Sequence, residues 1–322
     1  MYTVKIIEYV TYMYLRTLSF NQVNAILRAF YERDVFTKSQ LIGHIEELTD
    51  RIPGHQAVSR WLKPQRSGYY ALDGTWLKYR GCDIVLLILF DVVTLDTIAY
   101  HVAADETKDA YSTLLDLALP EISLGMNGFF CDGDPGLLAL LRERFPGKPI
   151  QLCVFHRYAR LGQLIPFRYC KSALDKQIKE RVEKVLFAGS KSAAINALHE
   201  LEQFAKQNQG YGKLQKAIAV LHHNFELLLT HFDHPEMSPY NNVLEGFNHV
   251  LKRRIRLMKG FKKDINIDRW IKLLILDWRF HTLKASEFKE RRKKTPLELA
   301  GVSLPVMYNW LTYVRKNYRK TH

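Results

Sequence analysis

Hydrophobic residues in the first sixty positions recur at the spacing of helical turns. Two Ser/Thr-x-x-Gln capping boxes, starting at Ser19 and Thr37, mark the starts of two predicted helices. The apolar positions behind them lie one turn apart: Val23, Ile26, Leu27 and Phe30, then Leu41, Ile42, Ile45 and Leu48. After a Pro-Gly break, residues 55–62 predict a third short helix. We therefore expect residues 1–66 to form a helix-turn-helix DNA-binding domain, although a plain helical cap on the next domain would show the same pattern.

The pattern changes to β after a linker at residues 63–68. Three runs rich in β-branched and aromatic residues follow, and the short turns between them predict antiparallel hairpins. Later apolar runs alternate with helical stretches, which predicts parallel strands joined by helical crossovers. The predicted strands are Tyr69–Tyr79, Asp83–Val93, Thr97–Ala103, Gly128–Cys131 and Pro149–Val154. This βββαβαβ order indicates an α/β fold with a five-stranded mixed sheet.

Helical spacing then continues without strands, and we interpret residues 157–234 as an all-helical insertion domain. A long helix begins at Val243, after a loop rich in Pro, Ser and Asn. The predicted core therefore combines residues 67–156 and 235–290. The remaining residues, 291–322, predict a basic helical tail.

Composition and charge narrow the class of partner. The 322 residues are 47% hydrophobic and 25% charged, as in ordinary globular proteins, and the net charge is +14. Residues 246–294 hold sixteen Lys and Arg against five Asp and Glu, which favours a polyanion such as nucleic acid. The four cysteines form no CxxC pair, and the longest apolar run, Ile84–Phe90, is too short to cross a bilayer. We expect a soluble intracellular protein without a membrane partner.

Three acids stand at positions suited to metal binding. Asp73 lies inside the first predicted strand, where an unpaired carboxylate would be costly to bury, although an Asp-Gly pair is more often a turn. Asp132 ends the strand 128–131, and ligand sites gather at the carboxyl ends of strands in such sheets. Asp134 is a rival, but its Pro neighbour is typical of a helix N-cap. We assign the chemical role to Asp132 and a structural role to Asp134.

Glu245 is the third acid, in the first turn of the long helix. The helix dipole alone would favour a carboxylate there. However, Asn248, His249 and Lys252 follow on the same helical face, so this face could bind a metal ion and grip a phosphodiester together. Two strand aspartates and one helix glutamate could hold two divalent ions about 4 Å apart, and Mg²⁺, or Mn²⁺ in its place, suits such oxygen ligands.

Four sequence blocks carry a resemblance to a known family. They are Leu72-Asp73-Gly74-Thr75-Trp76-Leu77-Lys78, Cys131-Asp132-Gly133, Cys153-Val154-Phe155-His156, and Asn241-Asn242-Val243-Leu244-Glu245-Gly246-Phe247-Asn248 with Leu251-Lys252-Arg253-Arg254. In this order they resemble the Mutator-like transposases and related bacterial and archaeal insertion-sequence transposases. The resemblance implies an RNase H-like core with a helical insertion, and Asp73, Asp132 and Glu245 as catalytic metal-binding acids.

The C-x-x-H pair, Cys153 and His156, has several explanations. The resemblance implies that the two residues shape the active site, but they could also form half of a zinc site, or be a buried cysteine and a surface histidine. The basic residues after Glu245 are expected to contact DNA, although they could form only a solvated helix face. The predicted DNA-binding residues are Asn248, Lys252, Arg253, Arg254, Arg256 and Lys259.

The resulting hypothesis is a transposase that cuts transposon ends and joins their 3′ hydroxyls to target DNA. Its partners would be the double-stranded DNA of element ends and target, and joining two ends implies a homo-oligomer in the active complex. Two alternatives remain from the sequence: a DNA-binding protein that derives from a transposase and has lost catalysis, and an RNase H-like metal-dependent nuclease.

Overall fold

The computed structural model describes residues 4–16, 18–122, 125–170, 172–257, 266–284, 286, 288–305 and 308–317. The chain forms two compact units, one of residues 1–126 with 243–322 and the other of residues 127–242. The division into a DNA-binding domain, a core, an insertion and a tail stays a prediction. In the compact units, the N-terminal helices group with the first three strands, and the helical insertion groups with the last two.

The N-terminal part of the first unit is helical, as its apolar spacing predicts. It consists of α1 (Val4–Leu15), α2 (Phe20–Tyr31), α3 (Lys38–Arg51) and α4 (His55–Leu62). Both predicted capping boxes form: the side chains of Ser19 and Thr37 accept from the backbone N–H groups of Gln22 and Gln40. Each box satisfies backbone donors that a helix start leaves open, so the helix starts follow from local sequence.

Three antiparallel strands follow: β1 (Tyr69–Tyr79), β2 (Cys82–Asp91) and β3 (Thr97–Ala103). The β1–β2 turn contains Arg80 and Gly81, both with positive φ, which is the conformation that a tight two-residue hairpin requires. Helix α5 (Lys108–Ile122) packs on β2 and β3. The residues from Val85 to Phe90 in β2 are fully buried, so the core of this unit is centred on the middle strand.

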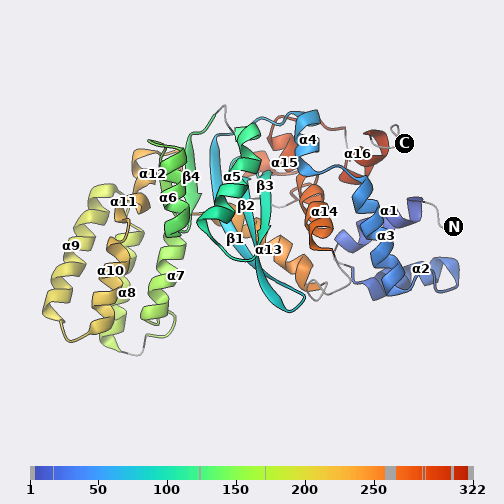
Figure 1. The fold of residues 1–322 in the computed structure, drawn as a ribbon. Helices are drawn as coiled ribbons and strands as arrows, with labels where there is room; N and C mark the ends of the chain where they lie inside the picture. Colours follow the sequence, from blue (N-terminus) through green and yellow to red (C-terminus); the bar gives the residue numbers. More distant parts are fainter. Residues whose placement is uncertain are drawn as a thin grey trace. The chain divides into compact units, whose positions relative to one another are not determined.

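The C-terminal part of the chain completes the first unit (Figure 1). It contains α13 (Asn242–Leu257), α14 (Ile267–Arg279), the short 3-10 helix η1 (Lys289–Arg291), α15 (Pro296–Leu299) and α16 (Trp310–Asn317). Helix α14 is buried along most of its length and contacts α3, α4 and β3. The N-terminal helices therefore share a core with the C-terminal helices.

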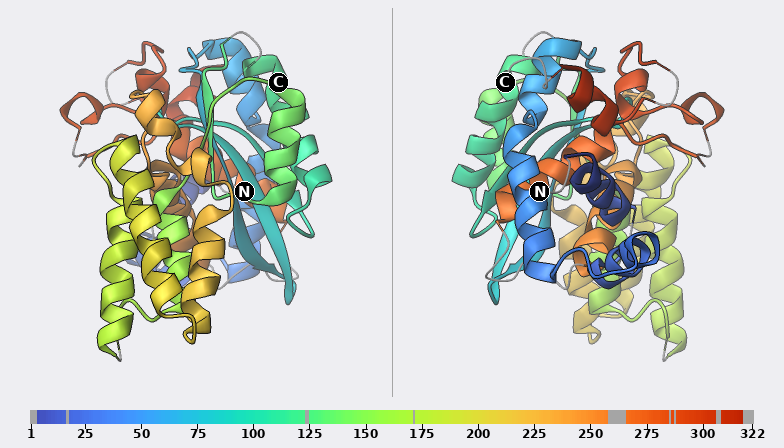
Figure 2. Two further views of the ribbon diagram at one scale, coloured as in Figure 1. Left: turned by 90° about the vertical axis from the view of Figure 1, so that its left-hand side faces the viewer. Right: turned by 90° about the vertical axis from the view of Figure 1, so that its right-hand side faces the viewer.

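The second unit begins with two parallel strands. Strand β4 (Gly128–Cys131) leads into α6 (Pro135–Arg144), and β5 (Ile150–Leu152) pairs with β4 in the register Phe129 to Ile150. The remaining elements are α7 (Val154–Leu164), α8 (Ala173–Leu186), α9 (Lys191–Gln207), α10 (Gly212–His222), α11 (Phe225–Leu228) and α12 (Thr230–Asp233). Helices α7 to α10 pack on one another, and the long helices lie side by side (Figure 2).

The strands form one five-stranded sheet in the order β3-β2-β1-β4-β5. Because β1–β3 are antiparallel and β4–β5 are parallel, the sheet is mixed. The predicted α/β class and five-stranded mixed sheet are confirmed. None of the helices in the described residues combines the length and apolarity needed to cross a lipid bilayer.

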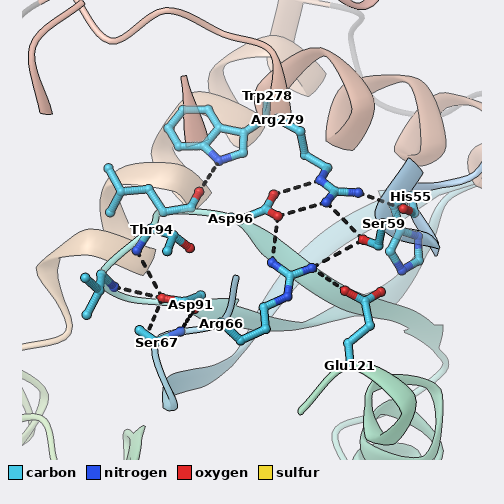
Figure 3. Close-up of polar contacts among 12 residues, drawn as sticks. His55, Ser59, Arg66, Ser67, Asp91, Thr94, Asp96, Glu121, Trp278 and Arg279 are labelled. Carbon is cyan, nitrogen blue, oxygen red and sulfur yellow. Dashed lines mark hydrogen bonds and ion pairs between the residues drawn. The ribbon is translucent and has the colours of Figure 1, made fainter. Parts of the chain in front are cut away.

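A polar network around one buried carboxylate connects the turn between β2 and β3 with four other segments of the first unit (Figure 3). Asp96, in the turn between β2 and β3, is fully buried and accepts from Arg279 of α14 at 2.7 and 2.8 Å and from Arg66 of the linker at 2.7 Å. Arg279 also donates to the carbonyl oxygen of His55 in α4 at 2.7 Å, and Arg66 also pairs with Glu121 of α5. Burial would raise the pKa of Asp96, but the two guanidinium groups outweigh it and lower this pKa. The carboxylate is therefore ionised in the folded protein.

A second aspartate organises the same turn. The Asp91 carboxylate accepts from the backbone N–H groups of Ser67, Val93 and Thr94 at 2.8 to 3.0 Å, and from the Ser67 hydroxyl at 2.7 Å. The linker is therefore bonded to the β2–β3 turn at two places, through Ser67 and through Arg66.

Replacing Asp96 with alanine should lower the free energy of unfolding by about 3 to 5 kcal/mol, because it leaves two buried guanidinium groups without their shared partner. The matched control is Asp83→Ala, which removes the exposed ion pair with Lys78 and should cost less than about 1 kcal/mol. Urea denaturation followed by circular dichroism measures both. Equal effects of the two substitutions would contradict a central role for Asp96.

His55 should make stability depend on pH. Burial and the nearby Arg279 lower the pKa of His55 to about 3. Between pH 6.5 and pH 3 the unfolded chain gains a proton here that the folded chain does not, so the free energy of unfolding should fall by at most about 1.4 kcal/mol per pH unit on acidification. In His55→Gln this part of the pH dependence should disappear, as measured by urea denaturation across that range. An unchanged slope would contradict the prediction.

Candidate functional site

Asp73 lies in the middle of β1, directly opposite Ile88 of β2. The Asp-Gly pair is therefore part of a strand, and the alternative of a turn is wrong. A side chain at Gly74 would collide with the Glu106 carboxylate, since a Cβ atom there would lie 2.8 Å from its Oε1. Neighbouring strand residues face opposite sides of the sheet, so Glu106 lies on the side away from the Asp73 carboxylate. Glycine at position 74 therefore leaves room for the Glu106 carboxylate.

Helix α13 lies on the Asp73 face of the sheet. The side-chain amide of Asn248 donates to Oδ2 of Asp73 at 2.8 Å, and the Phe247 ring lies 5.2 Å from the ring of Phe90, centroid to centroid. Phe90 is paired with Ala71, two residues before Asp73, so it shares the Asp73 face. Glu245 stands one turn before Asn248, half-buried in the first turn of this helix. The polar face predicted for α13 thus includes a contact to a predicted catalytic acid.

Asp132 directly follows β4 in the second unit and is exposed. The Asp134 carboxylate instead accepts from the backbone N–H of Leu137 at 2.8 Å, with Pro135 at the first position of α6. The predicted capping role of Asp134 is therefore confirmed. This assignment leaves Asp132 as the acid at the carboxyl end of β4 that is available for a ligand.

Cys153 and His156 lie at the junction of β5 and α7. Cys153 is the buried N-cap residue of α7, and its N–H donates to the carbonyl oxygen of Cys131 at 3.0 Å. His156 follows in the first turn and is half-buried. Because β4 and β5 are parallel and in register at their last residues, Asp132 and Cys153 follow the same edge of this strand pair. The pair is therefore built into the strand end rather than into a surface loop.

The basic residues of α13 differ in exposure. Lys252, Arg253 and Arg256 are exposed, as a DNA-binding face requires, whereas Lys259 lies outside the described residues. Asn248 is buried, and the contact it makes is with Asp73 rather than with solvent.

Arg254 departs from the predicted exposed basic face, because its side chain is only 4% exposed. It follows Phe247 and Leu251 on the buried side of α13, and its guanidinium carbon lies 3.7 Å from the ring centroid of Tyr14 in α1. Burial lowers the pKa of Arg254 to about 10. The reason is the helical repeat: Lys252, Arg253 and Arg254 are consecutive, so they cannot all lie on one face of the helix.

Sequence reasoning missed the contacts that α1 and Arg16, the residue directly after it, make around Arg254. Arg16 pairs with Asp277 of α14 and lies 2.8 Å from Nδ1 of His281. Tyr14 stacks on Phe20 and meets Trp270 of α14 edge-on at 5.2 Å. Apart from Phe20, these partners lie more than 250 residues away in the chain, so no local pattern could have shown them.

A sequence profile of the Mutator family of transposases matches residues 3–282, and the chain belongs to this family. It is 25% identical over 223 residues to the transposase for insertion sequence element IS905 of Lactococcus lactis subsp. lactis (strain IL1403), covering 65% of this chain and 53% of that protein. It is 23% identical over 186 residues to the transposase for insertion sequence element IS1201 of Lactobacillus helveticus, covering 55% and 46%. The chain thus spans about half the length of these curated relatives.

Replacing Arg254 with methionine should raise the free energy of unfolding by about 1 kcal/mol. Methionine keeps the contact with Tyr14 and removes a buried charge, and such replacements are often stabilising. The neighbouring Arg253→Met, at an exposed position, should change stability by less than about 0.5 kcal/mol. Chemical denaturation tests the pair. If Arg254→Met destabilised the protein, the charge would have a structural role.

Proposed function

We propose that this protein is a DDE transposase, which cuts DNA at transposon ends and joins the 3′ hydroxyls to target DNA. Membership of the Mutator family supports the reaction class. The mixed sheet, with three antiparallel strands followed by two parallel ones, supports an RNase H-like core. In the proposed active complex, two or more copies of the chain hold the double-stranded DNA of both ends and the target.

The observation that carries this proposal is the hydrogen bond between Asn248 and Asp73. It joins the strand of the first predicted acid to the helix of the third, across 175 residues of sequence. A side-chain amide that donates to a carboxylate oxygen fixes the orientation of that carboxylate. Asn248 is thus a positioning residue for Asp73, one turn from Glu245.

The acids are suited to divalent metal ions. Asp73 and Glu245 are half-buried and Asp132 is exposed, so none of the three carboxyl groups is fully buried in the interior. Carboxylate oxygens are the ligands that Mg²⁺ and Mn²⁺ prefer, and two such ions, when bound, would activate the attacking hydroxyl and stabilise the leaving oxygen. Asp73, Asp132 and Glu245 would hold them, and Cys153 with His156 would shape the strand end beside Asp132.

The rest of α13 is suited to hold DNA close to these acids. Lys252 lies two turns after Glu245 and is exposed, and Arg256 follows one turn later. Exposed cations at this spacing can contact successive phosphates along one strand, which fixes the position of the backbone without reading its sequence.

Asp132→Asn and Glu245→Gln should each lower Mg²⁺-dependent strand transfer of a DNA end at least about a thousandfold, since each removes a metal ligand worth several kcal/mol in the transition state. The control is Asp134→Ser, which keeps an N-cap residue and should retain activity. Gel analysis of a labelled DNA end measures both cleavage and joining.

Full strand transfer by either acid variant would contradict the site assignment. Cleavage without joining by the unmodified protein would instead support a metal-dependent nuclease. Sequence-specific binding without cleavage would support a non-catalytic DNA-binding protein.

Lys252→Ala and Arg256→Ala should each weaken DNA binding to a similar extent on all sequences, and each should reduce the slope of log K against log salt by about 1. Lys213→Ala, at an exposed position of α10 in the second unit, is the charge-matched control. Fluorescence anisotropy with a duplex at several salt concentrations measures the slope. An unchanged slope in both α13 variants would show that these residues do not contact phosphates.

A further inference from the structure

The first unit contains a pocket of about 560 Å³ on the side of α13 away from Asp73. Its walls come from α1, α13, α14, the segment after α14, and the start of the segment leading into α16. This volume lies within the range of small-molecule sites in proteins. The proposed catalytic function makes no use of this pocket.

Cations outnumber acids in the pocket wall. Of the described residues, Arg16, Arg253, Arg254 and Lys284 line it, against one carboxylate, that of Asp277, which pairs with Arg16. His281 also lines the wall, and burial lowers its pKa to about 4, so it is neutral at pH 7. The pocket therefore carries a net positive charge and favours an anion.

Arg254 is the sharpest indication of a ligand. Its side chain is 96% buried, since 4% is exposed, and among the described residues its Nε and Nη1 atoms have no hydrogen-bond partner. Its Nη2 donates to the Leu18 carbonyl oxygen at 3.4 Å. A buried guanidinium with unpaired donors is costly, and a phosphate that reaches Arg254 from the pocket would supply the acceptor that these donors lack.

Aromatic rings make up much of the remaining wall. Tyr12, Trp278 and Tyr308 are half-buried, while Phe247 and Phe280 are buried behind them. Rings of this kind stack on nucleobases, and they do so with little preference for sequence. Phosphate-binding cations and stacking surfaces thus line one pocket of suitable size.

We propose that this pocket binds a nucleoside phosphate, with the phosphate on Arg253, Arg254 and Lys284 and the base against the aromatic wall. A free mononucleotide or the 5′-phosphorylated end of a DNA strand could supply this chemistry, and the second source rests on the proposed function. Because the pocket and Glu245 share helix α13, a bound nucleotide would contact the same helix that carries the predicted acid.

Isothermal titration calorimetry on the full chain, without divalent metal, tests the proposal. The probes are deoxyadenosine monophosphate, deoxyadenosine, inorganic phosphate, and a short single strand with or without a 5′ phosphate. We expect deoxyadenosine monophosphate to bind at least about tenfold more tightly than deoxyadenosine or inorganic phosphate. If the DNA end is the source, the phosphorylated strand competes with the mononucleotide and the unphosphorylated strand does not; if neither strand competes, the ligand is the free nucleotide.

Two surface variants keep the test independent of folding. Arg253→Ala with Lys284→Ala removes two exposed cations, and Val250→Glu places a negative charge at an exposed position of the wall. Each should raise the Kd at least about tenfold, whereas Val250→Thr and Lys213→Ala should change it less than about twofold. Arg254→Met should also lose binding while the protein stays folded.

Equal affinity for deoxyadenosine and its monophosphate, or binding that is unchanged in both surface variants, would overturn the proposal. Because no metal or catalysis is involved, this outcome is distinct from failure of the proposed function, which is read from strand transfer by the acid variants.

Discussion

The burial of one ionised carboxylate, Asp96, constrains the whole first unit. A charge in the interior is stable only with partners in good geometry, and both guanidinium groups that supply them come from distant parts of the chain. The linker, α4, α5 and α14 must therefore all be in place before the turn between β2 and β3 is satisfied (Figure 3). Because Arg279 is the last residue of α14, this requirement holds the end of α14 at the turn between β2 and β3, and the neighbouring Trp278 contacts Phe247 of α13.

Helix α13 has two faces with different chemistry, and the packing of α14 separates them. One face directs Asn248 to Asp73 and carries Glu245, while the other places Arg254 under α1. Phe247 lies between the two, in contact with Phe90 of β2 and with Trp278 of α14. The hydrophobic contacts thus set the rotation of the helix, and the rotation decides which polar residues face the sheet and which face the N-terminal helices.

Local features of this protein could be predicted from its sequence, because local physics determines them. The capping boxes at Ser19 and Thr37 and the capping role of Asp134 depend on residues within a few positions of one another. The partners of Asp96 and the burial of Arg254 depend on contacts between residues far apart in sequence, and a charged residue gives no local sign that it will be buried. The set of Asp73, Asp132 and Glu245 stays a prediction, although the structure supplies the Asn248 contact to one member.

The shared core of the N-terminal helices and α14 has a mechanical meaning. The indole N–H of Trp270 in α14 donates to Glu46 of α3 at 3.0 Å, and Lys272 donates to the Thr49 carbonyl oxygen at 2.8 Å. Helices held in this way are expected to move together with α14 rather than independently of it. A displacement of α3 would therefore be passed on to α14 and, through the contact of Trp278 with Phe247, to α13, the helix that carries Glu245. A fragment beginning at residue 67 would expose the apolar side of α14 and lose this connection.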